Sequence, residues 1–299
     1  MSAKELGQIH TINSLAQVSD TVRKFNQDIP AELTQQLQRM VRQGQSFKVV
    51  GIDMTLSTVG TVGGGQVTGH IKYYAPTKGR CEAYRSAFKA MKTAMELQGI
   101  TNLSHNKLYD FRVRINDQDT GRADDAVSFK NQATLDGTNG LCLDHQTQPE
   151  ASVFGVHNRM VLPTVTGVPT GDLFASGFNT MGVQATPTDF VLNDTTLYSG
   201  NSNEASIQME SIPFMLTWSP DTGNQGDALS SVSFQWRPDP ALYLSVLTGQ
   251  LQFEIEEINV DGGASALELN INTMVSGWKS IMSTKSTNST KSKSKRRRK

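Results

Sequence analysis

The stretch FKVVGIDMTLSTV, residues 47–59, decides the fold class, because the hydrophobic period of the chain changes there. Apolar side chains recur at every second position: Val50, Ile52, Met54 and Leu56. A period of two is typical of a strand with one buried face. Glycines at 60 and 63–65 predict a turn, and GQVTGHIKYYAP, residues 65–76, predicts a second strand. The sequence therefore predicts two long neighbouring strands, at 47–59 and 64–75.

A helix is predicted directly after the second strand, at 81–98, with Gly99 as its end. Apolar side chains recur there at steps of three and four: Tyr84, Phe88, Met91 and Met95. Lys89, Lys92 and Glu96 occupy the opposite side. Such a stripe is more typical of a helix that packs on a sheet than of a ligand pocket.

The remainder of the chain, to residue 278, predicts short strands rather than further helices. Nine β-like runs are separated by turn clusters: 109–115, 126–135, 152–162, 189–198, 205–218, 231–237, 242–247, 251–260 and 266–274. Many short strands without alternating helices are typical of an antiparallel sandwich or barrel. We therefore expect an all-β domain over 47–278 with one inserted helix.

Residues 1–46 predict a partly helical arm before this domain. Four apolar residues lie at helical spacing between Pro30 and Gly44: Leu33, Leu37, Met40 and Val41. Proline is favoured in the first turn of a helix and glycine just beyond its end. The apolar stripe indicates packing, either on the core of the same chain or on a neighbouring subunit.

Composition excludes several classes of protein. Of the 299 residues, 37% are hydrophobic and 19% are charged, so the chain can bury a substantial core. No apolar run approaches the roughly 20 residues that span a bilayer. The N-terminus, MSAKELGQIHTINSL, lacks the pattern of a secretory signal. Two cysteines, Cys81 and Cys142, are too few for a disulfide scaffold or a four-cysteine zinc site.

The neutral total charge hides a basic C-terminal segment. Nine of the 28 basic residues and none of the 28 acidic ones fall in 279–299, which leaves 19 basic against 28 acidic residues in 1–278. The segment has almost nothing to bury, so we expect a disordered tail. A mobile polycation can follow a phosphate backbone without reading bases. The predicted nucleic-acid-binding residues are Lys285, Lys291, Lys293, Lys295, Arg296, Arg297, Arg298 and Lys299.

The same basic cluster has other interpretations. A nuclear-import signal over 293–299 is compatible with nucleic-acid binding. Binding to an anionic membrane is less favoured, because no apolar anchor adjoins the cluster. A tail that only improves solubility is a third alternative.

Motifs for catalysis are scarce. The sequence has no GxSxG, HExxH, CxxC or Walker motif. Cys142 and His145 lie three positions apart, but nothing around them indicates an activated thiolate. Cys81, at the start of the predicted helix, is better explained as a buried structural thiol. We therefore expect that the protein is not an enzyme.

The most acidic stretch, residues 116–125, is a candidate calcium site. Its four carboxylates could supply hard oxygen ligands: Asp117, Asp119, Asp124 and Asp125. The spacing is not that of an EF-hand, because Gly121 takes the fifth position and the terminal Glu is missing. A solvated loop is the stronger interpretation, and no other cofactor is predicted.

The order of elements resembles that of the jelly-roll capsid proteins of small icosahedral viruses. Two long strands, a helix and many shorter strands lie between an amphipathic N-terminal segment and a polycationic tail. The resemblance spans the architecture without a diagnostic motif, and is closest for viruses with single-stranded DNA, with small RNA viruses as the alternative. One departure is that the basic arm of such proteins is usually N-terminal. The resemblance implies a jelly-roll sandwich, with one jelly roll favoured over two.

The resemblance also implies a function. A capsid protein self-assembles into a shell of many copies in the virion, and its tail would package the genome, here single-stranded DNA, without sequence specificity. An import signal in the tail would act in the host nucleus. The alternative is a cellular, lectin-like β-sandwich module with a nuclear-targeting tail. Neither interpretation names a receptor.

Overall fold

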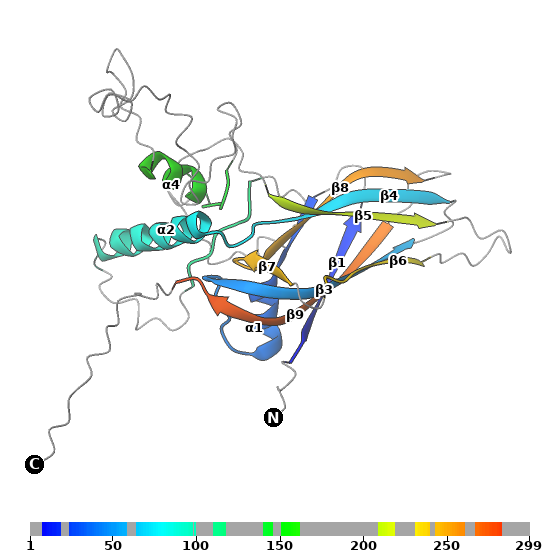
Figure 1. Cartoon of the computed structure of the whole chain (residues 1–299), viewed down its shortest axis with the longest axis horizontal. Helices are drawn as coiled ribbons and strands as arrows, with labels where there is room; N and C mark the ends of the chain where they lie inside the picture. The colour runs from blue at the N-terminus through cyan, green and yellow to red at the C-terminus, as the bar shows by residue number, and fades with distance from the viewer. Residues whose placement is uncertain are drawn as a thin grey trace, which may run out of the picture.

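The computed structural model describes residues 8–18, 24–58, 64–97, 99, 110–117, 140–145, 151–161, 209–218, 231–239, 243–260 and 267–282. Most of these residues form strands, in two antiparallel sheets with few helices (Figure 1). The expectation of a mainly β protein is confirmed. None of the helices in these ranges is both long enough and apolar enough to cross a bilayer.

Two sheets form the body of the protein. In sheet 1 the order is β1 (His10–Val18), β9 (Leu267–Ser280), β3 (Gln45–Thr58) and β6 (Ser231–Trp236), and the short β7 (Leu244–Leu247) also pairs with β3. In sheet 2 the order is β2 (Lys24–Asp28), β8 (Gln250–Val260), β4 (Gly65–Tyr73) and β5 (Glu210–Trp218). The described helices are α1 (Ile29–Leu37), α2 (Lys78–Leu97) and α4 (Val153–Val161).

The strand pairs are nested along the sequence. β1 pairs with β9, β2 with β8, β3 with β6, and β4 with β5, all antiparallel. These pairs belong alternately to sheet 1 and sheet 2, and the further pairs β3·β9 and β4·β8 join them within each sheet. The first half of the chain therefore runs against the second half, across both layers.

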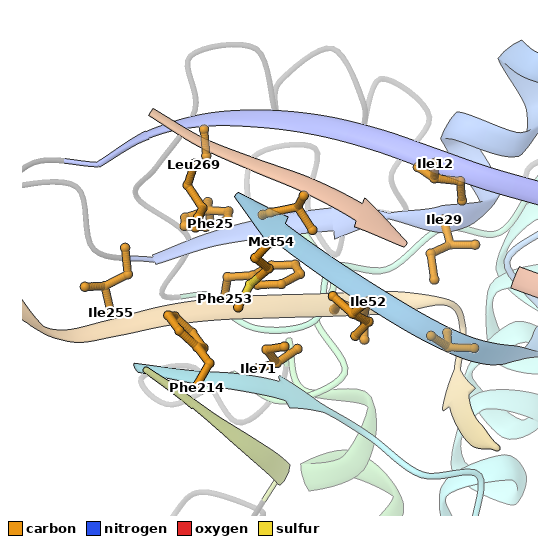
Figure 2. Packing of buried hydrophobic residues seen from close by; sticks show 14 of the residues in the cluster. Ile12, Phe25, Ile29, Ile52, Met54, Ile71, Phe214, Phe253, Ile255 and Leu269 are labelled. Atoms are coloured by element: carbon orange, nitrogen blue, oxygen red, sulfur yellow. The ribbon is translucent and has the colours of Figure 1, made fainter. Parts of the chain in front are cut away.

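The main core lies between the two sheets. Figure 2 shows side chains from both sheets that point toward one another, among them Met54 of β3 and Phe253 of β8. The ring of Phe25 stacks on that of Phe253, with ring centroids 5.2 Å apart. Each such side chain contributes roughly 1.5–3 kcal/mol when fully buried. The alternating pattern of the strands thus supplies one apolar face to each sheet.

A β-bulge changes the phase of the alternation in β3. The sequence predicted Val50 on the inner face, but Val49 is fully buried and Val50 is only half-buried. The pairing of β3 with β9 shifts register between Val49 and Gly51, where one extra residue is accommodated. From Ile52 onward the predicted inner positions are buried, so the prediction is confirmed beyond the bulge.

The N-terminal segment is more than a helical arm. Its helix lies at Ile29–Leu37, within the predicted region, and Asp28 caps it by accepting a hydrogen bond from the Ala31 amide. However, His10–Val18 and Lys24–Asp28 are strands, one in each sheet. The alternation in HTINSLAQV, which buries Ile12, Ala16 and Val18, provides the physical reason. This part of 1–46 belongs to the sandwich.

A second core lies beyond one end of the sheets and is built mainly from residues between β4 and β5, together with Leu247 and Ile281. Its buried members include Tyr84 of α2, Phe111, Leu143 and Phe154 of α4. Tyr84 donates a hydrogen bond to the Phe111 carbonyl at 2.7 Å, and their rings meet edge to face. In Figure 1, α2 and α4 lie beside one another at this end.

At the second core, the structure corrects the predicted packing of helix α2 and the predicted strand at 152–162. The buried face of α2 was predicted correctly, because Tyr84 is buried while Lys89 and Lys92 are exposed. The helix packs mainly on α4 and on segments 110–117 and 140–145, however, rather than on a sheet. The strand predicted at 152–162 is helix α4, whose first turn is capped by the Ser152 hydroxyl accepting from the Gly155 amide.

The other short runs have mixed outcomes. In the described part of segment 109–115, Arg112 and Arg114 form isolated bridges rather than a strand, and Arg114 pairs with Cys142. The runs 126–135 and 189–198 lie outside the described residues. The last four predicted runs, from 231 onward, correspond to β6, β7, β8 and β9.

Candidate functional site

The eight predicted nucleic-acid-binding residues of the tail, from Lys285 to Lys299, lie outside the described residues. The ninth basic residue of the segment, Lys279, is described. It lies near the end of β9, opposite Ser46 of β3, and its side chain is exposed. β9 is a central strand of sheet 1, and after it the chain continues through Ile281, which is buried in the second core.

Basic and aromatic side chains meet at this end of sheet 1. The Lys48 ammonium lies 4.1 Å from the centroid of the Tyr243 ring, and that tyrosine is 53% exposed. Lys48 lies opposite Gly277 of β9, two positions from Lys279. We call Lys48, Tyr243 and Lys279 the strand-end patch. In the part of the chain that the structure describes, neither lysine is paired with a carboxylate.

The candidate calcium residues are only partly described. The Asp117 carboxylate contacts the ring of His145, with 3.2 Å between Oδ2 and Nδ1, and both side chains are largely buried. Asp119, Asp124 and Asp125 lie outside the described residues. Among the residues that are described, no group of three or more His, Cys, Asp or Glu side chains could hold a metal. The ring of His145 is a partner of Asp117 in the structure.

The two cysteines are not activated. Burial raises the pKa of Cys142 to about 12, and the nearby Arg114 only partly offsets this effect. Burial also raises the pKa of Cys81, against the opposing charges of Arg85 and Arg80. A thiol with a raised pKa carries almost no thiolate near neutral pH. Neither cysteine is therefore poised as a nucleophile.

A group of buried polar side chains, which we call the polar seam, fastens segment 110–117 to the sandwich. It consists of Asp28, Gln43, Asp110, Arg112, Asn116, Gln250 and Gln252. Asn116 and Gln252 exchange two amide hydrogen bonds, each of 3.0 Å. The Val113 carbonyl accepts hydrogen bonds from the side chains of Gln43 and Gln250. Polar contacts, rather than apolar packing alone, hold this segment against β2 and β8.

Three charged groups lie together in the polar seam. Arg112 forms an ion pair with Asp28, which is also the N-cap of α1. Burial raises the pKa of Asp28, although the Arg112 guanidinium opposes this effect. Asp110 accepts a hydrogen bond from the backbone N–H of Gln43, with 3.2 Å between Oδ2 and N. The Arg112 guanidinium is thus paired with Asp28 and also acts by its charge on Asp110, with Arg42 as a further positive charge near Asp110.

Asp110→Asn is expected to stabilise the protein at pH 7 and to have little effect near pH 4. Burial raises the pKa of Asp110 from 3.8 to about 6, although the Gln43 amide and Arg112 oppose it. Because the folded-state pKa exceeds the unfolded one, wild-type stability decreases as the pH rises from about 4 to about 6. A pKa difference of this size corresponds to roughly 3 kcal/mol.

Urea unfolding of both chains at the two pH values measures this effect. Asp53→Asn is the control, since Asp53 pairs with Arg237 on the surface. If Asp110→Asn changed the free energy of unfolding equally at pH 7 and pH 4, Asp110 would not titrate in this range.

The outer face of sheet 2 carries paired charges. Glu254 of β8 lies between Lys24 of β2 and Lys72 of β4 and forms ion pairs with both. The His70 ring lies 2.9 Å from Glu256 on the same face. These contacts bridge neighbouring strands, so Lys24 and Lys72 each have a carboxylate partner, in contrast to the lysines of the strand-end patch.

Sequence reasoning missed the polar seam and the strand-end patch. A local signal existed for one residue only: Asp28 directly precedes Ile29 and Pro30, a pattern typical of a helix N-cap. The other contacts join residues far apart in the sequence, such as Asn116 and Gln252. No family model, curated protein or solved structure matches this chain.

Proposed function

We propose that the chain is a viral major capsid protein, which adopts a jelly-roll fold, self-assembles into an icosahedral shell and packages its genome through the basic C-terminal tail. The strand order carries this proposal, and the charge of the tail supports the packaging role. The genome that fits the resemblance best is single-stranded DNA.

The nested strand pairs are the support for a jelly roll. That fold is a double-sheet sandwich of eight antiparallel strands in two Greek keys. The pairs β1·β9, β2·β8, β3·β6 and β4·β5 make eight strands, and successive pairs alternate between the sheets. Among the described strands only the short β7 falls outside this scheme. This number and arrangement of strands support one jelly roll rather than two.

The fold alone does not select the function, because lectin domains and cupins are also jelly rolls. The basic segment 279–299 makes the difference. This segment has nine basic residues and no acidic one, whereas residues 1–278 have 19 basic and 28 acidic residues. A cationic tail attached to a net-negative body binds phosphates with the tail and limits general adhesion of the body. This division of charge fits a subunit that lines a container for nucleic acid.

The full-length protein is expected to form closed particles of megadalton mass. Closed shells arise when copies repeat the same contacts around symmetry axes. Size-exclusion chromatography followed by electron microscopy of the purified protein measures this directly. Ile271→Asp is the control, because Ile271 is buried in the centre of sheet 1 and an unpaired carboxylate there prevents the sandwich from forming. Elution of the wild-type protein as a monomer or small oligomer would favour the lectin-like alternative.

A further inference from the structure

We propose that the strand-end patch, Lys48, Tyr243 and Lys279, is a second binding surface for single-stranded nucleic acid, on the folded body beside the root of the tail. This inference rests on the proposed packaging function and adds to it a contact that the tail cannot make. The tail residues 283–299 include no aromatic side chain. Bases that pass along the tail therefore have no ring there on which to stack.

The pairing of the strands places the two lysines on one face. Lys48 is directly opposite Gly277, and Lys279 is directly opposite Ser46, so the lysines occupy diagonal positions on neighbouring strands. Residues two apart along a strand share a face, and diagonal neighbours are about 7–8 Å apart. Phe47 and Val49, which flank Lys48, are both fully buried. Lys48 and Lys279 therefore project from the outer face of sheet 1.

The surface between these lysines is open. Gly277, on the same face, has no side chain, and a Cβ added there would meet no atom within 4 Å. Ser245 of β7 is the other residue directly opposite Lys48. β3, β7 and β9 lie side by side at the end of the sandwich that is nearer to α2 (Figure 1). A flat ligand can thus approach the lysines without displacing a side chain at Gly277.

The chemistry of the patch matches a nucleotide in two respects. A base stacks on an exposed aromatic ring, and this contact is sequence-tolerant because every base has a π-face. A lysine ammonium neutralises a phosphate as a point charge. The Lys48 ammonium lies 4.1 Å from the centroid of the Tyr243 ring. The phosphate-binding charge and the ring for stacking are therefore side by side on the surface. Single strands fit better than duplexes, because only unpaired bases can turn onto a protein side chain.

Other occupants fit the patch less well. The tail of a neighbouring copy carries the same positive charge as Lys48 and Lys279 and would be repelled. An acidic peptide would satisfy the lysines but would leave the half-exposed Tyr243 ring without a stacking partner. A nucleic acid is favoured because, under the proposed function, the tail binds one close to the patch. Lys285 follows Lys279 by six residues, which is at most about 20 Å of extended chain. A strand bound by the tail root therefore lies within reach of the patch.

Full-length protein titrated with a short fluorescent oligothymidylate, over a range of salt concentrations, tests the proposal. Tyr243→Ser is expected to weaken binding by about fivefold or more, the effect of losing one stacked base, with no change in salt dependence. Tyr243→Phe keeps the ring and should bind like wild type. Lys48→Gln should lower the slope of log affinity against log salt by about 0.7, the value for one phosphate contact on a single strand.

Lys89→Gln is the matched control, because Lys89 is also exposed but lies on α2. This variant should change neither the affinity for the oligothymidylate nor its salt dependence. Tyr243→Ser binding as tightly as wild type would overturn the proposal, and so would an equal loss of affinity for duplex DNA. Removal of residues 285–299 tests the packaging role separately. If that deletion weakens binding while Tyr243→Ser does not, the proposed role of the strand-end patch is wrong and the packaging role of the tail stands. If neither change weakens binding, both proposals are wrong.

Discussion

Deletion of residues 285–299 is expected to remove most of the nucleic-acid binding of the protein while leaving the sandwich folded. The deletion removes eight basic residues and no apolar one, and it begins after the last described strand. With eight phosphate contacts on a single strand, the affinity of the intact protein should fall by roughly 10³-fold between 50 and 200 mM salt. The truncated protein should show a much weaker dependence, set by those basic residues of the body that still contact the strand.

Binding of unrelated single-stranded sequences at several salt concentrations measures both the loss and the lack of sequence preference. Circular dichroism of the truncated protein should match that of the intact one. Shells made from the truncated chain should still form but contain much less nucleic acid. If truncated and intact proteins bound single-stranded DNA equally well at low salt, nuclear import would become the better explanation for residues 293–299.

Arg112→Leu is expected to destabilise the protein by about 3–5 kcal/mol at pH 7, the typical cost of removing one partner from a buried ion pair. The substitution leaves the carboxylate of Asp28 buried without its guanidinium partner. It also removes the positive charge that Asp110 shares. Both carboxylates have raised pKa values, so acidification protonates them in the folded state and relieves part of the loss. The destabilisation should therefore be smaller near pH 4 than at pH 7.

Urea unfolding of Arg112→Leu at both pH values gives the measurement. The double variant Asp28→Asn/Arg112→Leu should regain much of the stability at pH 7, because asparagine removes the charge and still caps α1. Arg237→Leu is the control for an exposed ion pair and should cost about 1 kcal/mol or less. A double variant no more stable than Arg112→Leu alone would show that lost packing, rather than an unpaired charge, causes the effect.

Strands with one buried face could be predicted from the sequence, and elements without such a pattern could not. β3, β4 and β9 have one face on the core, so their alternation is visible in the sequence. The inner phase of β3 failed at Val50, because a bulge is set by pairing with β9 and has no local signal. α4 was mistaken for a strand since short apolar runs fit either period, and its Ser152 cap was overlooked.

The candidate sites divide in the same way. The basic tail was evident from composition alone, because its charges need no partner elsewhere in the chain. The polar seam and the strand-end patch depend on residues that only the fold brings together, such as Lys48 and Tyr243. No spacing in the sequence connects them. Sequence reasoning thus found the segment that is distinguished by its charge alone, and missed the groups of residues that only the tertiary structure brings together.

The pairing of β1 with β9 has a consequence for how the protein is made. Val18 faces Leu267, so at 5–20 residues per second the ribosome completes the partner of β1 roughly 10–50 s after β1 itself. Until then β1 has no neighbour in sheet 1, and β3 lacks the strand that separates it from β1. Such long-range pairing is slow to form. A chain that terminates early, before β9, cannot close the sheet, so unfinished translation products are excluded from any assembly that requires the folded sandwich.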